Sequence, residues 1–135
     1  MDDSAGQTLD EGIRTLLDDT NFASVATIGP DAGPQSSVVW IHREDNQVVF
    51  SALRHRQKVR NLERDSRVSV TVFDHNNPYH SVEIRGRAEI QPDPGNALGN
   101  RLSHKYLGED APDDPPGSER VLVRITPLRI NKFSA

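Results

Sequence analysis

The sequence contains no cysteine and few aromatic residues. The missing cysteine excludes disulfides, thiolate nucleophiles and thiolate metal ligands as sources of structure or chemistry. Aromatic residues make up 5% of the chain, and the single tryptophan, Trp40, lies in a β-patterned segment where a core position is favoured over a cofactor stack. The 135 residues predict one domain over residues 1–135 with a single buried core.

Long hydrophobic runs are also missing, since no stretch approaches the ~18 apolar residues of a membrane-spanning helix. The first residues, Met1 to Ser4, carry acids where a signal peptide carries Lys or Arg, and no apolar segment follows. These features predict a soluble, cytoplasmic protein without membrane contacts. The formal net charge is −4, which does not indicate a basic nucleic-acid-binding protein.

Known catalytic and metal-binding patterns are absent from the sequence. The five histidines include no pair at helical spacing with an intervening Glu, and no cysteine can complete a ligand set. There is no nucleophile elbow, phosphate-loop lysine motif or dinucleotide glycine fingerprint. The sequence therefore predicts no metal site and identifies no catalytic residue.

What the chain does contain is a series of short β-patterned segments separated by turn residues. Strands are expected at 22–28, 35–42, 47–51, 67–74, 80–91, 121–125 and 129–133, the first three as a β-meander. Helices are expected at 9–21, from about 57 to 67, and at 96–106. Thr8 is the expected N-cap of the first helix, and Pro127 is expected to separate the last two strands. Gly86 indicates a bulge or a close approach by another backbone or a ligand.

This pattern predicts a mainly β fold with small helices, a six- to seven-stranded antiparallel barrel. From the residues alone we expect the barrel to be closed. An α+β sheet with helices on one face is the alternative.

The segment 54–67 concentrates positive charge in an acidic protein, with six basic and two acidic side chains. Its helix is expected to open near Gln57, just after a strand that ends at Ser51, so backbone N–H groups and the positive helix end would lie beside the basic residues. This is the geometry of a phosphate site, where Arg56 would bind as a two-pronged fork and Lys58 as a point charge.

Two other interpretations of this segment stay open at this stage. The charges could form the solvated face of an amphipathic helix, partly neutralised by Glu63 and Asp65. A nucleic-acid interface is less favoured, because the patch is short, has no interleaved aromatic residues and belongs to an acidic chain.

Two motifs carry a resemblance to a known family. The run 22–35, FASVATIGPDAGPQ, resembles the opening hairpin of the pyridoxamine-phosphate-oxidase-like split β-barrel family. The run 57–69, QKVRNLERDSRVS, looks like the second signature of this family, in the form common among its deazaflavin-dependent members. The late strand RVLVRITP also fits, so the resemblance covers roughly Leu16 to Phe133.

The resemblance implies a split β-barrel that forms a homodimer, with two cofactors at the subunit interface. A size argument agrees, because a barrel this small is filled by its own side chains and cannot enclose a tricyclic ring. A second subunit would then complete the pocket on the outside of the barrel. The partner is expected to contribute residues from the 74–80 loop.

The resemblance also assigns cofactor-binding residues by position. The phosphate-binding stretch is matched by Ser51, Arg56, Lys58 and Asn61. The strand that contacts the ring or its ribityl chain is matched by Gln35, Ser37 and Val38, while the backbone of Ser51 and Ala52 would edge the ring. The acidic loop 108–118 has no counterpart, so its role is open.

The function implied is an oxidoreductase that uses reduced deazaflavin coenzyme F420 to deliver a hydride to an organic small-molecule acceptor. The alternatives are an FMN-binding oxidoreductase of the same family and a non-catalytic flavin carrier. The C-terminal segment 127–135 lacks the Trp- and Arg-containing ending of the true pyridoxamine phosphate oxidases, so oxidation of that vitamin is not expected.

Overall fold

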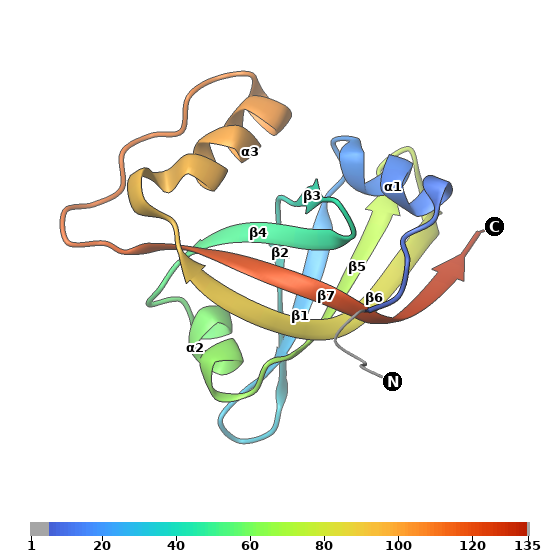
Figure 1. The fold of residues 1–135 in the computed structure, drawn as a ribbon, viewed down its shortest axis with the longest axis horizontal. Helices are drawn as coiled ribbons and strands as arrows, with labels where there is room; N and C mark the ends of the chain where they lie inside the picture. The colour runs from blue at the N-terminus through green and yellow to red at the C-terminus, as the bar shows by residue number, and fades with distance from the viewer. Residues whose placement is uncertain (1–5, 135) are drawn as a thin grey trace.

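The computed structural model describes residues 6–134, which form one curled antiparallel sheet with helices at its rim (Figure 1). The strand order is β2-β1-β5-β6-β7-β4-β3. The strands are β1 (Ala23–Ile28), β2 (Pro34–Val39), β3 (His42–Glu44), β4 (Gln47–Leu53), β5 (Arg67–Asp74), β6 (Asn77–Pro92) and β7 (Arg120–Phe133). The helices are α1 (Glu11–Asp18), α2 (Gln57–Arg64), α3 (Ala97–Leu107) and the short 3-10 turn η2 (Pro94–Asn96).

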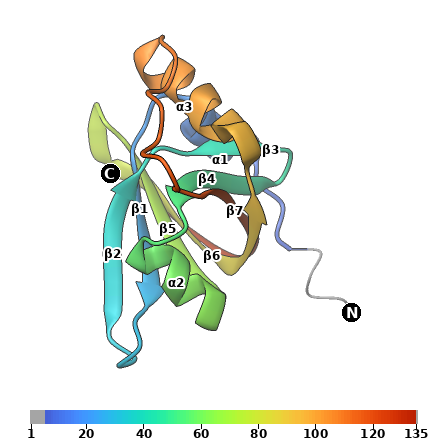
Figure 2. The ribbon, with the colours of Figure 1, turned by 90° about the vertical axis from the view of Figure 1, so that its left-hand side faces the viewer.

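The sheet is not closed, because β2 and β3 are its two edges and do not pair with each other. The mainly β, seven-stranded split barrel is therefore confirmed, and the closed barrel expected from the residue pattern alone is wrong. Helices α3 and α2 lie on opposite sides of β4 in both views (Figures 1 and 2). No helix of the described part of the chain is long and apolar enough to cross a bilayer.

The expected strand 35–42 is divided into β2 and β3, which corrects the predicted meander. Strand β2 pairs with β1, whereas β3 pairs with β4. Between them, the backbone of Ile41 is bonded to α3: its N–H lies 3.3 Å from the Tyr106 hydroxyl, and its carbonyl accepts from Lys105 Nζ at 2.8 Å. Because these side chains satisfy the backbone groups, the chain can leave one end of the sheet and join the other.

Pro127 does not interrupt the last strand, since β7 runs through it to Phe133. The residue opposite is Gly86, and the register shifts between Arg85 and Gly86. A Cβ added to Gly86 would lie 2.0 Å from the Thr126 carbonyl oxygen, so only glycine allows this close approach. The expected bulge is confirmed, and it accommodates a proline that lacks an N–H for the ladder.

The helix and strand boundaries differ from the expected ones in small ways. The N-cap of α1 is Asp10, whose carboxylate accepts from the Ile13 N–H at 2.9 Å, and not Thr8. The helix ends at Asp18 and not near Asn21, whose buried side chain instead donates to the Leu16 carbonyl at 2.9 Å. Helix α2 begins at Gln57 as predicted and ends at Arg64, three residues early, and α3 starts one residue later than expected. Strand β6 begins at Asn77, so the expected loop 75–79 is only a turn.

The core lies inside the curled sheet and under α1 and α2. Alternate residues of β1 and β5 point inward, so fully buried and partly buried positions alternate along these strands. The largest fully buried side chains are Phe50, Leu9, Leu17, Ile41, Ile84 and Ile125. Side chains therefore fill the interior, and any sizeable ligand must bind at the rim or on the outside.

Candidate functional site

A pocket of about 480 Å³ is lined by the ends of β2 and β4, the start of α2, the inner face of α3 and the loop 108–119. Figure 2 shows how these elements are arranged. This volume is within the usual range for small-molecule sites. Five of the predicted cofactor-binding residues line it, namely Val38, Ser51, Ala52, Arg56 and Lys58. Ser37 adjoins the pocket through its contact with Lys58.

One end of the pocket is cationic. Lys58 is half-buried in the first turn of α2, with Nζ 3.3 Å from the Ser37 hydroxyl. Burial, together with the neighbouring charge of Arg56, lowers the pKa of Lys58. Within residues 6–134, neither Lys58 nor Arg56 pairs with a carboxylate. Two unpaired cations at a helix N-terminus form a site that favours an anion.

Arg120, at the start of β7, is a third cation in the pocket, which the sequence interpretation missed. Its guanidinium Nη1 lies 3.5 Å from the Ser51 hydroxyl, and its Nε donates to Asp114 at 3.1 Å. Asp114 belongs to the acidic loop, which also places Glu109 in the pocket wall. The loop whose role was open therefore forms one side of the pocket, and Arg120 anchors it there.

Helix α3 supplies a wall that the sequence interpretation did not assign to the site. Asn96, Gly99 and Ser103 face the pocket at spacings of three and four residues, with Leu102 and Leu107 beside them. Ser103 is only 2% exposed, and its hydroxyl has no hydrogen-bond partner. A polar residue, a glycine and a serine at i, i+3 and i+7 on one helix was the signal that could have identified this wall.

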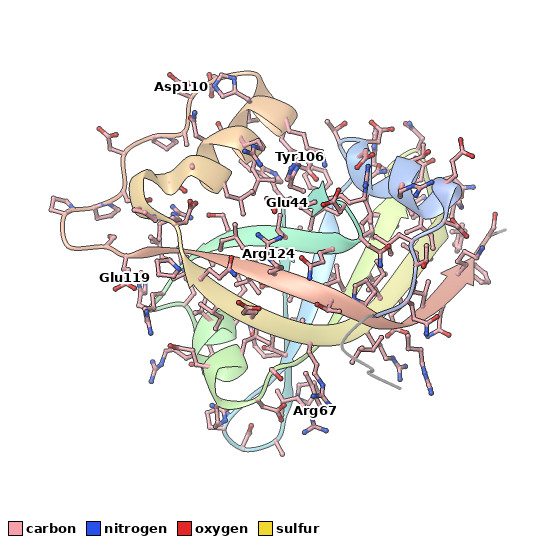
Figure 3. The ribbon with its side chains drawn as sticks, viewed as in Figure 1. Glu44, Arg67, Tyr106, Asp110, Glu119 and Arg124 are labelled. Carbon is pink, nitrogen blue, oxygen red and sulfur yellow. The ribbon has the colours of Figure 1, made fainter. Side chains whose placement is uncertain are left out.

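Trp40 packs against the small hydrophobic cluster of Val49, Leu98 and Leu102, and its stacking on a cofactor remains a prediction. Its ring stacks on Tyr106 at 5.2 Å between centroids and 6° between planes, and it also lines the pocket. Tyr106 reaches down from α3, as Figure 3 shows, and donates its hydroxyl to the Asn21 carbonyl at 2.5 Å. Burial raises the pKa of Tyr106, so it stays protonated in the neutral range and holds the stack in place.

Asn61 and Gln35 do not line the pocket. Asn61 is fully buried beneath α2, where its amide donates to the Thr27 hydroxyl at 3.0 Å and accepts from Gln57 Nε2 at 2.7 Å. The Thr27 hydroxyl in turn donates to Gln35 Oε1 at 3.1 Å. The structure brings these residues together in a network that fixes α2 to β1 and β2. Direct contact of either residue with a cofactor remains a prediction.

A second hollow, of about 760 Å³, lies across the loop from the first. Its walls carry five acidic side chains, Asp93, Asp110, Asp113, Asp114 and Glu119, against the single cation Arg120. Such a surface repels phosphate. The smaller pocket is therefore the better candidate for a phosphorylated ligand.

The fold and the pocket together define a split-barrel protein with a cationic pocket at the rim of an open sheet. The family model described as pyridoxamine 5'-phosphate oxidase matches residues 9–134, and the chain belongs to this family. The resemblance inferred from the runs 22–35 and 57–69 is thus confirmed. A search of curated proteins found no match.

Solved structures give a similar result. An F420 reductase is 31% identical, with a TM-score of 0.80, and the match covers 91% of this chain and 98% of that one. A conserved hypothetical protein from Mycobacterium tuberculosis is 27% identical, with a TM-score of 0.76 and coverage of 96% and 87%. A putative pyridoxamine 5'-phosphate oxidase from Listeria innocua, at 16% identity, a TM-score of 0.73 and coverage of 93% and 98%, shares the fold.

Proposed function

We propose that this protein is an oxidoreductase that binds reduced coenzyme F420 in the rim pocket and transfers a hydride to an organic acceptor. The observation that carries the proposal is the half-buried, unpaired Lys58 beside Arg56 at the start of α2. Family membership supports an oxidoreductase in general, and 31% identity to an F420 reductase favours the deazaflavin over FMN.

The residues present fit a phosphorylated ring compound. Lys58 and Arg56 would hold the phosphate, since a partly desolvated ammonium without a carboxylate partner gains most from an anion. Ser37, Val38 and the backbone of β4 at Ser51 would orient the ring. Trp40, Leu102 and Leu107 add apolar surface to the α3 side of the pocket, beside the polar Asn96 and Ser103, and this limits water near the reacting atoms.

Bound reduced F420 supplies the hydride, and the protein supplies binding, orientation and a water-poor site. The acceptor gains a hydride at an electron-poor carbon and a proton at the neighbouring atom, while the coenzyme is oxidised by two electrons. We assign protonation of the product to solvent.

We also propose that the protein acts as a homodimer whose second subunit completes the pocket. Val38 is 69% exposed although it lines the pocket, so the site is open on the β2 side. Tyr79, at the tip of the β5–β6 hairpin, is 67% exposed and is a candidate for the partner's contribution. Light scattering after size exclusion should give twice the mass of 15.0 kDa for one chain.

The test is a parallel titration of the protein with F420 and with FMN, followed by fluorescence. We expect F420 to bind at least about tenfold more tightly, a difference of about 1.4 kcal/mol. Reduced F420 is then mixed with a panel of enones, quinones and tetrapyrroles, and its oxidation is followed by absorbance. Tighter binding of FMN would mean that FMN, and not F420, is the cofactor. Tight F420 binding without oxidation by any acceptor would identify the protein as a non-catalytic cofactor carrier.

A further inference from the structure

The α3 wall of the pocket contains two buried polar atoms without a partner, the Asn96 Oδ1 and the Ser103 Oγ. Within the described residues, these are the buried side-chain N or O atoms that lack any hydrogen bond. Both residues line the same pocket. Buried polar atoms are normally paired, and an unpaired one indicates a missing ligand, ion or water.

The backbone at the start of α3 is shaped to hold Asn96 in this position. Asn96 has the left-handed conformation, with φ 54° and ψ 44°, and Gly95 before it has φ 76°. The Asn96 side chain folds over Gly99, where an added Cβ would lie 2.0 Å from Oδ1. Asn96 therefore holds a strained backbone conformation at the start of α3, and Gly99 leaves room for its side-chain amide.

The two atoms lie about one helical turn apart on the same face of α3. Asn96 Oδ1 lies over the Cβ position of residue 99, and Ser103 is one helical turn further along. Side chains one turn apart have Cβ atoms about 5–6 Å apart. A group with a donor and an acceptor on neighbouring atoms, such as an N–H beside a carbonyl, can therefore bond to both.

The polar pair at this end of the pocket is uncharged, and Arg120, which also lines the pocket, is paired with Asp114. A carbonyl oxygen such as Asn96 Oδ1 only accepts hydrogen bonds, and Glu109 and Asp114 line the adjoining loop wall. The cations Arg56 and Lys58 come from α2, on the other side of β4 from α3 (Figures 1 and 2). The phosphate and this polar pair therefore occupy different ends of the site.

We propose that Asn96 and Ser103 recognise the hydride acceptor, and that this acceptor is an uncharged compound with an N–H or O–H donor next to a carbonyl, as in an imide or lactam. The Asn96 oxygen accepts from the donor and the Ser103 hydroxyl donates to the carbonyl. Trp40, Val39 and Leu102 contact the apolar remainder. The identity of the ligand as acceptor rests on the proposed function, whereas the binding of such a group does not.

Maleimide and N-methylmaleimide are a matched pair of probes, because they share the reducible double bond and differ in the N–H. The chain has no cysteine for them to alkylate. We expect reduced F420 to be oxidised with a kcat/KM about tenfold higher for maleimide. Ser103→Ala and Asn96→Gly should each remove most of this preference, with an unchanged F420 dissociation constant. Glycine is chosen at position 96 because it tolerates the left-handed backbone.

Binding without turnover is measured with the reduced products, succinimide and N-methylsuccinimide, by NMR amide shifts of the α3 residues. Selective binding of succinimide that both variants lose supports the inference, even if no F420 oxidation occurs and the proposed function fails. Gly99→Ala is a second way to remove the Asn96 contact, since the added Cβ would displace the Asn96 side chain. It should lose succinimide binding as the other two variants do. Thr15→Val, which removes a hydroxyl on α1 outside the pocket, is the matched control and should change nothing.

Two results would overturn the inference. Equal binding of both succinimides, unaffected by Ser103→Ala, would mean that the pair holds only water. A weaker F420 dissociation constant in the variants, with imide binding unchanged, would assign the pair to the cofactor ring. Ser103→Ala should also leave the unfolding midpoint of the free protein unchanged or raised, because the hydroxyl has no partner to lose.

Discussion

Helices α2 and α3 flank the same pocket, and each buries a small polar side chain, but the two side chains differ in their partners. Asn61 of α2 is bonded to Thr27 and Gln57, and Arg64 Nη2 lies 3.4 Å from its Oδ1. Ser103 of α3 has no partner at all. A buried polar group whose hydrogen bonds are made within the protein stabilises the fold. A buried polar group without a partner can hydrogen-bond to a ligand.

The basic residues of the two helices also differ in whether they have partners within the protein. On α2, Arg56 and Lys58 line the pocket without carboxylate partners. On α3, the basic residues have partners outside the pocket: Arg101 lies 3.7 Å from Glu44, His104 lies 2.6 Å from Asp110, and Lys105 donates to two backbone carbonyls. The pocket therefore has one cationic end and one neutral polar end.

The largest expected effect is on stability, from Asn61→Ala. This change removes a fully buried amide with its hydrogen bonds to Thr27 and Gln57, at about 0.5–1.5 kcal/mol for each bond, and the cavity that it leaves adds to the loss. We expect the free energy of unfolding to fall by about 3 kcal/mol in urea titrations. Ser103→Ala is the control from α3 and should cost less than about 0.5 kcal/mol. Equal losses of unfolding free energy in the two variants would contradict the distinction between the hydrogen-bonded Asn61 and the unpartnered Ser103.

Lys58→Ala should weaken cofactor binding by about 1–3 kcal/mol, or roughly tenfold to a hundredfold, because it removes a charge-assisted hydrogen bond. The fold should stay intact, as circular dichroism can verify. Arg60→Ala is the matched control, since Arg60 is an exposed cation on the same helix and does not line the pocket. A dissociation constant unchanged in Lys58→Ala would remove this residue from the site.

The pH dependence of binding should report the lowered pKa of Lys58. Only the protonated ammonium attracts the phosphate, so affinity should fall as the pH rises through this pKa, and the decline should begin below the usual value of 10.5. Titrations between pH 7.5 and 10.5 measure this. Lys58→Arg should flatten the curve over this range, because a guanidinium stays charged; an equally steep decline would point to another group.

A second pH effect concerns Lys105, the α3 lysine whose ammonium donates to the Leu17 and Ile41 carbonyls. Burial lowers the pKa of Lys105 to about 8. Because the group regains its ordinary pKa of 10.5 on unfolding, the unfolded chain holds more protons between pH 8 and 10.5, and stability should rise with pH over this window. Lys105→Met should reduce that slope in urea titrations, while Lys132→Met, at an exposed cation, should preserve it.

Much of the fold could be predicted because it follows local patterns. The alternation of β1 and β5 and the start of α2 at Gln57 are visible in the residues themselves. The break between β2 and β3 could not be predicted, because it depends on Lys105 and Tyr106, which lie more than sixty residues away. The continuous β7 depends in the same way on Gly86 opposite Pro127.

The candidate site was predictable where it lies on contiguous residues. The stretch from Ser51 to Lys58 forms the cationic end as expected. Arg120 and the α3 wall reach the pocket only through tertiary packing, so their contribution needed the structure. Asn61 was predicted as a cofactor-binding residue but its side chain is buried and bonded to Thr27. Sequence position alone does not tell whether an amide points to a ligand or into the protein.

The break at Trp40 and Ile41 has a mechanical consequence. These two residues carry the chain from one edge of the open sheet to the other, and Trp40 also forms part of the pocket. A ligand seated there touches the residues that span the seam of the barrel. Occupancy should therefore slow amide hydrogen exchange along both free edges, β2 and β3, together.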